Sequence, residues 1–597
     1  MMKTALSIIF YLLSSSLFAE TLQEPIDAII NKIDPKINLG MMVVDLNTGD
    51  TLYQRAITKR FIPASNMKLF SDASALLALG PDYRFQTRLS TDATSLEDGI
   101  LHGSLYLSLP GDPTLTHTHL STLFSSLKAL GVTQITGSVI LDSDFASIQS
   151  QPPGIVAKDL NYSYGASLAP VIFDENRVSI TVNPSCQIGQ PALIEYSKPN
   201  GSFVLENHVI TVPGNVDSVR YSTTDDNHLV VRGKIGQRQH ALQDRIAIRN
   251  PLRHAESLIK ITLQNQGITL KGSVKLGPIQ PSLLLATRHS KPLTQLLADT
   301  LKPSDNLYAN SLYLRTASKL RDTPVDWQQA AAVLKQFMQQ QTGIDMHAAV
   351  LADGSGLSRR DRLTAEQTVS LLQYLYEQFP LAYEYIAALP ISGHDGTLEK
   401  RLAKPTQKGM VRAKTGSMAG ILSLSGYLYT ANNHTLAFAI FINTRHGTPS
   451  KISGRYRHLV DRLCGFLLKQ KPSDVNHQIV SHSPHTRTYQ KHPSDTDKYR
   501  SQALKWRRIE HALKQDLNSQ PVTIVFRNNQ LVVLDRNSKA NHVWTTLKKI
   551  NHKHHIAVTL QGPSAPDHIE QPQLLWVQSD HTPAHAKRVW TLRDMVG

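Results

Sequence analysis

The chain has 597 residues, which is too long for one hydrophobic core, so its length predicts roughly three to five domains. Apolar residues make up 41% of the sequence and charged residues 18%, as is ordinary for folded, soluble protein. The net charge of +16 favours anionic partners: nucleic acid, an acidic membrane surface, or a polymer rich in carboxylates or phosphates.

The first residues have the layout of a secretory signal peptide. A basic start at Met1-Met2-Lys3 precedes an apolar run, and Leu17-Phe18-Ala19 resembles a small-residue cleavage site. We expect residues 1–19 to be removed, and an uncleaved anchor is the alternative. Export makes nucleic acid an unsuitable partner for the positive charge. No later run reaches about 18 apolar residues, the length that a membrane-spanning helix needs.

Hydrophobic periodicity and turn residues predict the elements of the main body. The expected helices cover residues 22–33, 65–80, 293–301, 307–320, 327–341, 365–379 and 454–470. The expected strands cover residues 41–46, 51–53, 103–109, 138–141, 178–182, 208–212, 229–234, 268–276, 411–414, 422–429 and 435–443. The first two strands flank the turn Asn47-Thr48-Gly49-Asp50 and form a hairpin.

Residues 82–288 are expected to be an insertion, because short alternating runs separated by turns dominate them. This insertion is mostly β and has room for two nested subdomains. The segments 20–81 and 289–470 on either side are expected to form one domain around one antiparallel sheet. Long surface insertions permit this, since they cost little loop-closure entropy.

The C-terminal part changes in composition. Residues 471–500 are polar and predict a linker, whereas residues 501–597 predict a small α+β domain that contains four of the five tryptophans. From Lys471 onward there are 18 Lys and Arg against 10 Asp and Glu, a charge of +8 and half of the excess. The expected helices are 502–517 and 543–550, and the expected strands are 522–526, 530–534, 556–560 and 574–577.

Neither a disulfide framework nor a metal site is expected. The chain has two cysteines, Cys186 and Cys464, and the sequence does not decide whether they form a disulfide. Cys464 lies in an apolar helical run typical of a buried thiol. The histidines His552, His554 and His555 have no partner carboxylates or cysteines in a recognised spacing. We therefore expect no metal and no cofactor.

The first candidate site is Pro63-Ala64-Ser65-Asn66-Met67-Lys68, at the head of the helix predicted over residues 65–80. Side chains three residues apart share one face of a helix, so Ser65 and Lys68 would lie one turn apart at its positive end. A hydroxyl beside an amine can be a nucleophile beside its base. A simple N-cap is the alternative interpretation of Ser65. The same spacing recurs at Ser125-Lys128 and Ser257-Lys260.

The second candidate is Lys302-Pro303-Ser304-Asp305-Asn306, where Pro303 interrupts one helix and Ser304 precedes the next. Such a loop can place the Ser304 hydroxyl beside the Asn306 carboxamide at a helix start. Helix capping by Ser304 or Asp305 is the alternative.

The third candidate is Lys414-Thr415-Gly416-Ser417, at the end of a predicted strand. Lys414 and Thr415 can bind a carboxylate, and Gly416 lets an extended peptide approach the strand edge. The alternative is an exposed edge lysine before a glycine bulge.

In this order the three segments form the signature Ser-x-x-Lys, Ser-Asp-Asn and Lys-Thr-Gly, which resembles penicillin-binding proteins and serine β-lactamases. The distance of 239 residues from Ser65 to Ser304 leaves room for a domain insertion. Such an insertion is similar to that of class C low-molecular-weight penicillin-binding proteins, the D-alanyl-D-alanine carboxypeptidase/endopeptidase family. The likeness covers about residues 22–468. Further stretches that resemble the family are 159–166, 353–359 and 393–398.

The resemblance implies an α/β (α+β) penicillin-binding transpeptidase/β-lactamase-like fold, with an antiparallel sheet flanked by helices, a large mostly β insertion and an extra C-terminal domain. It implies catalytic roles for Ser65, Lys68, Ser304, Asn306 and Lys414. It implies substrate-binding roles for Thr415, Gly416, Ser417, Asp159, Tyr164 and Arg359. Ala419 stands where some relatives have a polar residue, which leaves the fine substrate preference open.

The function that the resemblance implies is serine-type D-Ala-D-Ala carboxypeptidase and D,D-endopeptidase activity on peptidoglycan stem peptides in the periplasm. β-Lactams would be covalent inhibitors, and the basic C-terminal extension would contact an anionic wall or membrane surface. A serine β-lactamase and a catalytically idle peptidoglycan-binding protein are the alternatives, although the insertion argues against the first and the intact motifs against the second.

Overall fold

A computed structural model describes residues 22–470, except 146–147, 149–150, 197–202, 281 and 445–449, together with four strands beyond residue 520. The chain divides into two compact units, Met1–Asp474 and Val475–Gly597. The predicted signal peptide, the predicted linker, the two helices predicted after residue 500 and the histidines at 552, 554 and 555 lie outside the described residues.

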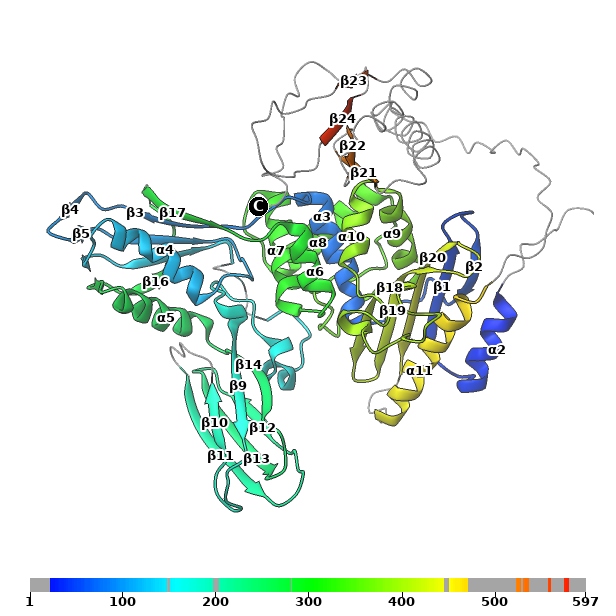
Figure 1. Ribbon diagram of the computed structural model, residues 1–597, viewed down its shortest axis with the longest axis horizontal. Coiled ribbons are helices and arrows are strands. Elements are labelled where there is room, and N and C mark those ends of the chain that lie inside the picture. The colour runs from blue at the N-terminus through cyan, green and yellow to red at the C-terminus, as the bar shows by residue number, and fades with distance from the viewer. Residues whose placement is uncertain are drawn as a thin grey trace, which may run out of the picture. The chain divides into compact units, whose positions relative to one another are not determined.

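The centre of the first unit is a five-stranded antiparallel sheet with the strand order β18-β19-β20-β1-β2 (Figure 1). Its strands are β1 (Leu39–Asp45), β2 (Thr51–Arg55), β18 (Val411–Met418), β19 (Ile421–Tyr429) and β20 (Thr435–Asn443). β1 pairs with β20 from Leu39↔Ile442 to Asp45↔Leu436. The N-terminal hairpin and the C-terminal strands therefore share one sheet, as the sequence predicted.

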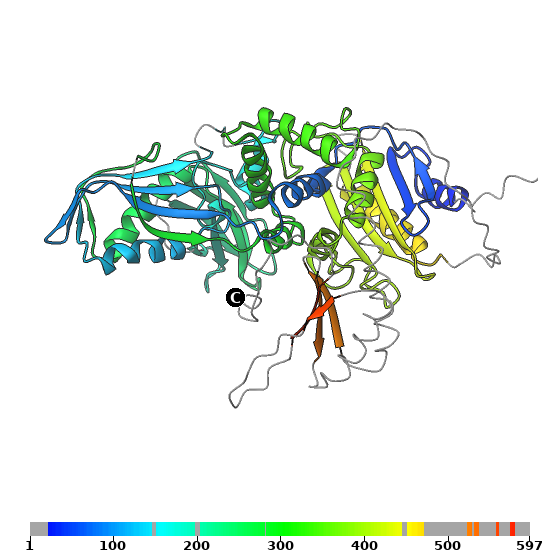
Figure 2. The ribbon, with the colours of Figure 1, turned by 90° about the horizontal axis from the view of Figure 1, so that it is seen from above.

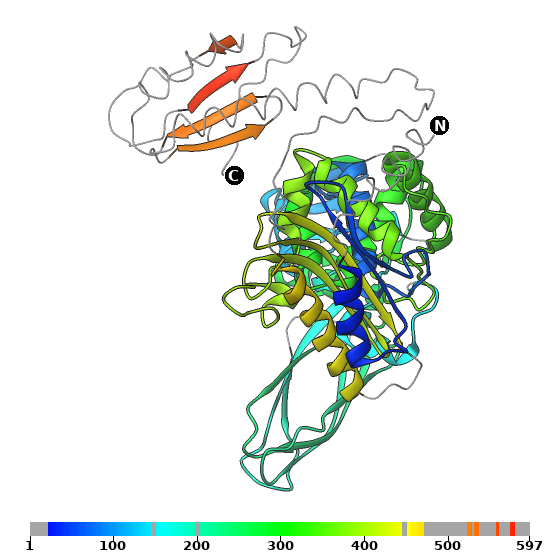
Figure 3. The same cartoon turned by 90° about the vertical axis from the view of Figure 1, so that its right-hand side faces the viewer.

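Helices cover both faces of this sheet, which explains the nearly continuous apolar sequence of β20. Alternate residues such as Phe438 and Ile440 pack with α2 (Gln23–Ile33) and α11 (Ser450–Leu467). Those between them, such as Phe441, pack into the helical layer on the other face. In Figure 3, α2 and α11 run side by side over their face of the sheet. The Tyr456 hydroxyl joins these two helices by donating to Asp34 at 2.6 Å.

The other face carries the helices that hold the candidate site. They are α3 (Met67–Leu79), α6 (Leu293–Leu301), α7 (Asn306–Arg321), α8 (Trp327–Thr342), α9 (Ala365–Glu377) and α10 (Leu381–Ala388). Hydrophobic periodicity predicts one apolar face for the helix over residues 65–80, but α3 is buried around its whole circumference, since every residue from Met67 to Leu76 is buried. Its polar residues Lys68 and Asp72 therefore lie in the interior of the protein.

The segment between α3 and α6 forms two lobes beside the helical layer (Figures 1 and 2). The first lobe contains β3 (Gln86–Thr91), β4 (Ser95–Glu97), β5 (Ile100–His102), β6 (Leu105–Leu109), β7 (Gln134–Ile135), β8 (Val139–Ser143), β15 (Thr269–Leu270), β16 (Val274–Leu276), β17 (Leu283–His289), α4 (His117–Ala129) and α5 (Pro251–Asn265). The second contains β9 (Arg177–Asn183), β10 (Leu193–Tyr196), β11 (Val204–Val212), β12 (Arg220–Thr223), β13 (His228–Gly236) and β14 (Leu242–Ala247).

The sequence did not predict the helices α4 and α5 within this mostly β segment. Both have start signals: Thr116 forms a capping box with His119, and Asn250 caps α5 ahead of Pro251. In α4 the frequent Ser and Thr hide the helical period of its four buried residues, Leu120, Leu123, Phe124 and Leu127.

Arg177, the first residue of β9, connects this segment to the start of α7. Its guanidinium forms a bidentate pair with Asp305, with Nη1–Oδ2 at 2.6 Å and Nη2–Oδ1 at 3.1 Å. Nη1 also pairs with Glu175 at 2.6 Å, and Nε donates to the Ser163 carbonyl at 2.8 Å. Only 4% of the Arg177 side chain is exposed, so the ion pair is desolvated and each buried charge is compensated by the other.

The described part of the second unit is an antiparallel sheet in the order β21-β22-β24-β23. Its strands β21 (Val522–Arg527), β22 (Gln530–Asp535), β23 (Ala557–Thr559) and β24 (Leu574–Gln578) agree with the strands predicted there. Among the described residues, no helix has both the length and the apolar character to cross a bilayer. Both cysteines are free thiols, with Cys464 buried and Cys186 exposed.

Replacing Arg177 with alanine is expected to lower the free energy of unfolding by about 3 kcal/mol or more, because Asp305 would stay buried without its cation. Chemical denaturation followed by circular dichroism measures this loss. The matched control is Arg245→Ala, since Arg245 also pairs with Glu175 (2.7 Å) but its side chain is 47% exposed. We expect the control to cost less than about 1 kcal/mol. Equal losses in the two variants would contradict the structural role of the Arg177–Asp305 pair.

Candidate active site

Ser65 lies in a 3-10 turn, Ala64–Asn66, that leads into α3. The turn is held in an unusual backbone conformation, since Ala64 has a φ of +48°. Ser65 is half-buried, and its Oγ lies 3.1 Å from Nζ of Lys68. The spacing of three residues thus brings the hydroxyl and the amine together, although Ser65 precedes the α-helix rather than belonging to its first turn.

Lys68 is fully buried, and its Nζ contacts three oxygen atoms. Besides Ser65 Oγ, these are Asn306 Oδ1 at 2.6 Å and the Ser355 carbonyl at 2.7 Å. Burial lowers the pKa of Lys68 to about 8, while the aspartates around it act in the opposite direction. An amine with such a pKa has a substantial neutral fraction near neutral pH, as a general base requires.

Lys414 is the second buried amine of the site. Burial, together with the positive charge of Lys68, holds the pKa of Lys414 well below its usual value. Its Nζ donates to the Thr415 carbonyl at 3.0 Å. Two ammonium groups in one dry site repel each other, so each one favours the neutral form of the other.

The segment Ser304-Asp305-Asn306 starts α7. Asp305 is the N-cap and accepts hydrogen bonds from the backbone N–H groups of Leu307 (2.9 Å) and Tyr308 (3.2 Å). Ser304 has a φ of +67°, a left-handed conformation that costs a residue with a Cβ about 1 kcal/mol or more. Of the two capping residues considered from the sequence, Asp305 has this role, and Ser304 is held in a strained turn.

Asn306 has a fixed orientation because both ends of its carboxamide are bound. Its Oδ1 accepts from Lys68, and its Nδ2 donates to the Tyr164 carbonyl at 2.8 Å. Tyr164 belongs to the 3-10 turn Ser163–Gly165 in the segment between α3 and α6. This segment therefore contributes a backbone atom to the environment of the site.

The Lys414–Ser417 motif lies within β18, which continues to Met418 rather than ending at the motif as predicted. The strand continues because Thr415, Gly416 and Ser417 remain in register with β19, although they lack apolar alternation. β18 is an edge strand whose outer side pairs with Pro390–Ser392 along Val411–Ala413, so an extended peptide can pair with its Lys414–Ser417 part.

Gly416 permits close contact between β18 and the nucleophile turn. A Cβ at this position would lie 2.1 Å from Ser423 Oγ, 2.8 Å from the Pro63 carbonyl and 3.0 Å from the Ser65 nitrogen. The Thr415 hydroxyl donates to Thr397 Oγ1 at 2.7 Å, and Ser417 is exposed.

Sequence reasoning missed Asn66, which joins the turn to the sheet. Its fully buried carboxamide faces the Lys414 carbonyl at 2.8 Å and the Ser425 hydroxyl at 2.7 Å. These partners are satisfied when Asn66 donates to the carbonyl and accepts from the hydroxyl. No local pattern announces this contact, because the partners are more than 340 residues away.

The loop 353–358 supplies the third oxygen that contacts Lys68, a role that no pattern in its sequence predicts. Asp353 shapes the loop by accepting from Ser355 Oγ at 2.7 Å and from the Gly356 nitrogen at 2.6 Å. Gly356 has a φ of +80°, and a Cβ there would lie 1.9 Å from the Ala64 carbonyl. Only glycine fits against the backbone of the nucleophile turn at this point.

The three residues carried over from the family resemblance lie in two places. The Tyr164 hydroxyl donates to Asp159 Oδ1 at 3.2 Å, and the Tyr164 ring stacks on Tyr162 with 5.4 Å between ring centres. Arg359 instead donates from Nη2 to the Ala419 carbonyl, 3.3 Å away, just beyond the end of β18. The structure thus brings Asp159 and Tyr164 together and places Arg359 by Ala419.

The segment 393–398, singled out by its family resemblance, supports the Ser304 loop. Asp395 pairs with Lys302 at 2.6 Å, and the Thr397 nitrogen donates to the Lys302 carbonyl at 3.1 Å. Both contacts hold Lys302, two residues before Ser304, against this segment.

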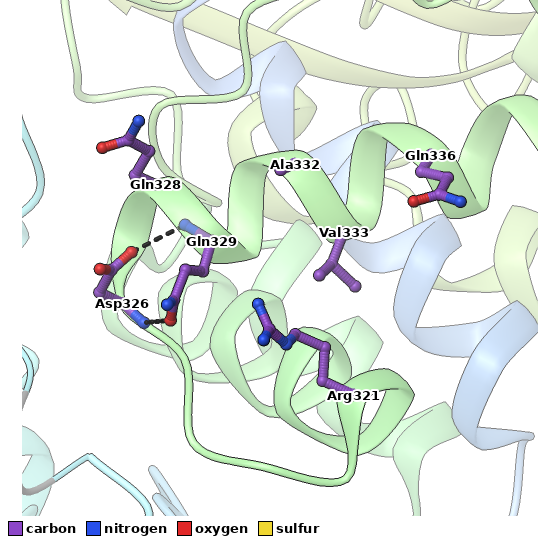
Figure 4. A pocket seen from close by; sticks show the side chains of 7 residues that line it. All are labelled: Arg321, Asp326, Gln328, Gln329, Ala332, Val333 and Gln336. Carbon is purple, nitrogen blue, oxygen red and sulfur yellow. Dashed lines mark hydrogen bonds between the residues drawn. The ribbon is translucent and has the colours of Figure 1, made fainter.

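A cavity of about 490 Å³ lies elsewhere, where α8 begins (Figure 4). It is lined by Arg321, Asp326, Gln328, Gln329, Ala332, Val333 and Gln336. In Figure 4 the bonds between Asp326 and Gln329 are those of a helix capping box. None of the three motifs contributes to this cavity.

A Ser-x-x-Lys turn, a Ser-x-Asn loop and a Lys-Thr-Gly edge strand that meet around Ser65 and Lys68 define the class of penicillin-binding proteins and serine β-lactamases. The model of the D-Ala-D-Ala carboxypeptidase 3 (S13) family matches residues 22–460, and the chain belongs to that family. It is a serine-type D-Ala-D-Ala carboxypeptidase with the penicillin-binding fold predicted from the sequence.

Known proteins of similar sequence align with most of the residues that the family model matches. The D-alanyl-D-alanine carboxypeptidase of Actinomadura sp. (strain R39) is 30% identical over 454 residues, covering 72% of this chain and 82% of that protein. The D-alanyl-D-alanine carboxypeptidase DacB of Haemophilus influenzae is 29% identical over 423 residues, covering 69% and 86%.

A solved structure has the same fold. The crystal structure of penicillin binding protein 4 (dacB) from Haemophilus influenzae superposes with a TM-score of 0.68 at 28% identity, covering 74% of this chain and 99% of that one. Its complex with a β-lactam superposes with a TM-score of 0.63 at 27% identity, with the same coverage.

Replacing Gly356 with alanine is expected to slow acylation by penicillin at least about tenfold and to lower stability by about 2 kcal/mol or more, because the new methyl group would displace the Ala64 carbonyl. Stopped-flow or gel-based labelling measures the rate, and thermal unfolding measures the stability.

Gly343→Ala is the matched control, since Gly343 also has a positive φ (+72°) but no atom within 4 Å of an added Cβ. We expect it to cost about 1 kcal/mol through backbone strain and to leave the acylation rate unchanged. If both variants acylate at the wild-type rate, Gly356 does not shape the nucleophile turn.

Proposed function

We propose that the enzyme cleaves the bond between two D-amino acids of peptidoglycan stem peptides through an acyl-enzyme on Ser65. The observation that carries this proposal is the contact of Lys68 Nζ with Ser65 Oγ, at 3.1 Å in a site where the lysine is fully buried. We extend the activity to D,D-endopeptidase cleavage, because the open edge of β18 accepts an extended peptide on its outer side.

The partners of Lys68 favour its action as the base. Asn306 Oδ1 and the Ser355 carbonyl are oxygen atoms that can only accept hydrogen bonds. A neutral amine that donates its two hydrogens to them has its lone pair left for the Ser65 hydroxyl proton. Lys68 then takes that proton as Ser65 Oγ attacks the substrate carbonyl carbon.

We assign roles within this proposal to the other motif residues. The backbone N–H groups of Ser65 and Ser417 stabilise the oxyanion, and Gly416 keeps β18 close to Ser65. Lys414 and Thr415 bind the terminal carboxylate of the substrate. Ser304 relays a proton to the leaving amine. Water then hydrolyses the ester on Ser65 and releases the shortened peptide.

Recognition of the stem peptide is assigned to Asp159, Tyr164 and Arg359. The Asp159 carboxylate offers an acceptor for a cationic group and the Arg359 guanidinium a donor for an anionic one. Tyr164 supports Asp159 by its hydrogen bond, and its carbonyl fixes Asn306.

The enzyme would act in the periplasm after removal of residues 1–19. Its division into a catalytic domain (20–81 and 289–470), an inserted domain (82–288), a linker (471–500) and a basic extension (501–597) belongs to the same proposal.

Ser65→Ala is expected to abolish covalent labelling by a fluorescent penicillin, because it removes the hydroxyl that contacts the buried amine of Lys68. The variant should release no D-alanine from a pentapeptide and should leave cross-linked muropeptides intact. Peptide mass spectrometry locates the label in the wild-type protein.

Ser125→Ala is the control, since Ser125 has the same spacing to a lysine but its hydroxyl donates to the Thr122 carbonyl at 2.7 Å. This variant should label normally. Labelling that survives Ser65→Ala would exclude Ser65 as the nucleophile. Rapid turnover of nitrocefin without D-alanine release would instead identify a β-lactamase.

The linker and the C-terminal extension are proposed to bind the anionic polymers of the cell wall, because together, from Lys471 onward, they carry a net charge of +8. A chain shortened after Gln470 is expected to sediment less with peptidoglycan than the full chain, with a difference that disappears as salt is raised. Its acylation rate serves as the control for correct folding. Equal sedimentation of the two chains would remove this role from the extension.

A further inference from the structure

Asp72 lies one helical turn beyond Lys68 on α3, on the same face of the helix. It has no accessible surface, and among the described residues neither of its carboxylate oxygens has a hydrogen-bond partner. The neighbouring Ser71 hydroxyl donates instead to the Gly354 carbonyl at 2.7 Å. A buried carboxyl group without a hydrogen bond is costly, so its presence between the motifs requires an explanation.

The other acidic groups near Lys68 already have partners. Asp305 forms the ion pair with Arg177 and caps α7, and Asp353 accepts from the donors of its own loop. Asp361 accepts two backbone N–H groups through Oδ1, and burial together with Asp353 raises its pKa well above the usual range. Among these acidic groups, Asp72 is the one for which neither oxygen has a hydrogen-bond partner among the described residues.

Asp72 interacts electrostatically with both buried amines, Lys68 on its own helix and Lys414 on β18. Among the described residues, Tyr385 on α10 also interacts electrostatically with Asp72, and its hydroxyl donates to the Leu69 carbonyl at 2.9 Å. Two ammonium groups and one carboxylate thus share a dry space.

We propose that Asp72 is a positioning residue of the catalytic centre, whose carboxylate is the internal counter-charge shared by Lys68 and Lys414. The inference rests on the proposed function of Lys68 as the base and of Lys414 as the cation for the substrate carboxylate. In the reactive state Lys68 is neutral and Lys414 is charged. An ionised Asp72 makes this state neutral as a whole, which a low-dielectric site favours.

The electrostatic directions agree with this arrangement. The Asp72 charge raises the pKa of both lysines, against the lowering effect of their burial. Burial raises the pKa of Asp72 itself to about 8, and the two lysines and the neighbouring Ser71 hydroxyl lower it, so Asp72 ionises over the same pH range in which Lys68 becomes neutral. The three groups therefore titrate together, and removal of the carboxylate should shift the pKa values of both lysines in the same direction, to lower pH.

The test is the pH dependence of the second-order rate constant for acylation by a penicillin in the full-length protein. Acylation needs Lys68 neutral and Lys414 charged. The rate therefore rises with pH as Lys68 loses its proton, which is the acidic limb of the profile, and falls as Lys414 loses its proton, which is the alkaline limb. In Asp72→Asn both limbs are expected to move to lower pH, by about one unit. At a pH well below the acidic limb, the variant should thus acylate about tenfold faster relative to its own maximum.

Ser74→Ala is the matched control, because Ser74 is a buried polar residue of the same helix whose hydroxyl donates to the Phe70 carbonyl at 2.7 Å. If Asp72 has a purely structural role, Asp72→Asn will resemble Ser74→Ala: its thermal stability will change and both limbs of its pH profile will stay in place. If Asp72→Asn does not accumulate as folded protein, Asp72→Thr makes the same measurement with a smaller neutral side chain.

Limbs that stay in place, that move to higher pH, or that move equally in Ser74→Ala overturn the inference about Asp72. These outcomes leave the proposed function intact, provided that the wild-type protein is acylated on Ser65. A wild-type protein that penicillin does not acylate fails the proposed function instead, before Asp72 is considered.

Discussion

The arrangement of the site depends on the burial of the Lys68 ammonium and on the oxygen atoms that compensate for it. Removing a charged amine from water costs several kcal/mol even after the protein relaxes, and each hydrogen bond to a charged group returns about 1.5–3 kcal/mol. The three oxygens come from Ser65, Asn306 and Ser355, which lie on three separate segments of the chain. The base can therefore be buried only when these segments meet, so folding and assembly of the catalytic centre are one event.

The segment inserted between α3 and α6 takes part in this assembly. Asn306 reaches Lys68 with one end of its carboxamide because the Tyr164 carbonyl holds the other end. Arg177 fixes Asp305 one residue earlier, at the N-cap of the same helix. The segment thus acts on the centre through the backbone and charge of α7.

The sequence predicted those parts of the fold and site that rest on local pattern. The 3.6-residue period located the helices from residue 293 to residue 377, and the spacing of Ser65 and Lys68 predicted their contact. Gly416 was expected to let an extended substrate peptide approach β18, whereas the atoms close to it in the structure are Ser423 Oγ and backbone atoms of Pro63 and Ser65. The parts that the sequence did not reveal depend on contacts between distant segments. Asn66, Asp72 and the Ser355 carbonyl have no periodicity or spacing that marks them, because their partners are set by tertiary packing. β18 was predicted too short for a related reason, since its last residues lack apolar alternation and are held in the strand by pairing with β19.

The same sheet explains how a long insertion is compatible with a site that requires sub-ångström placement. β1 pairs along its whole length with β20, so the first and last parts of the domain close on each other in the middle of the sheet. Loop-closure entropy grows only slowly with the length of the segment between them. The ends of the insertion are fixed at α3 and α6, so the sequence and length of its two lobes can change without moving Ser65. Arg177 and Tyr164 cannot be changed in this way, because they hold Asp305 and Asn306.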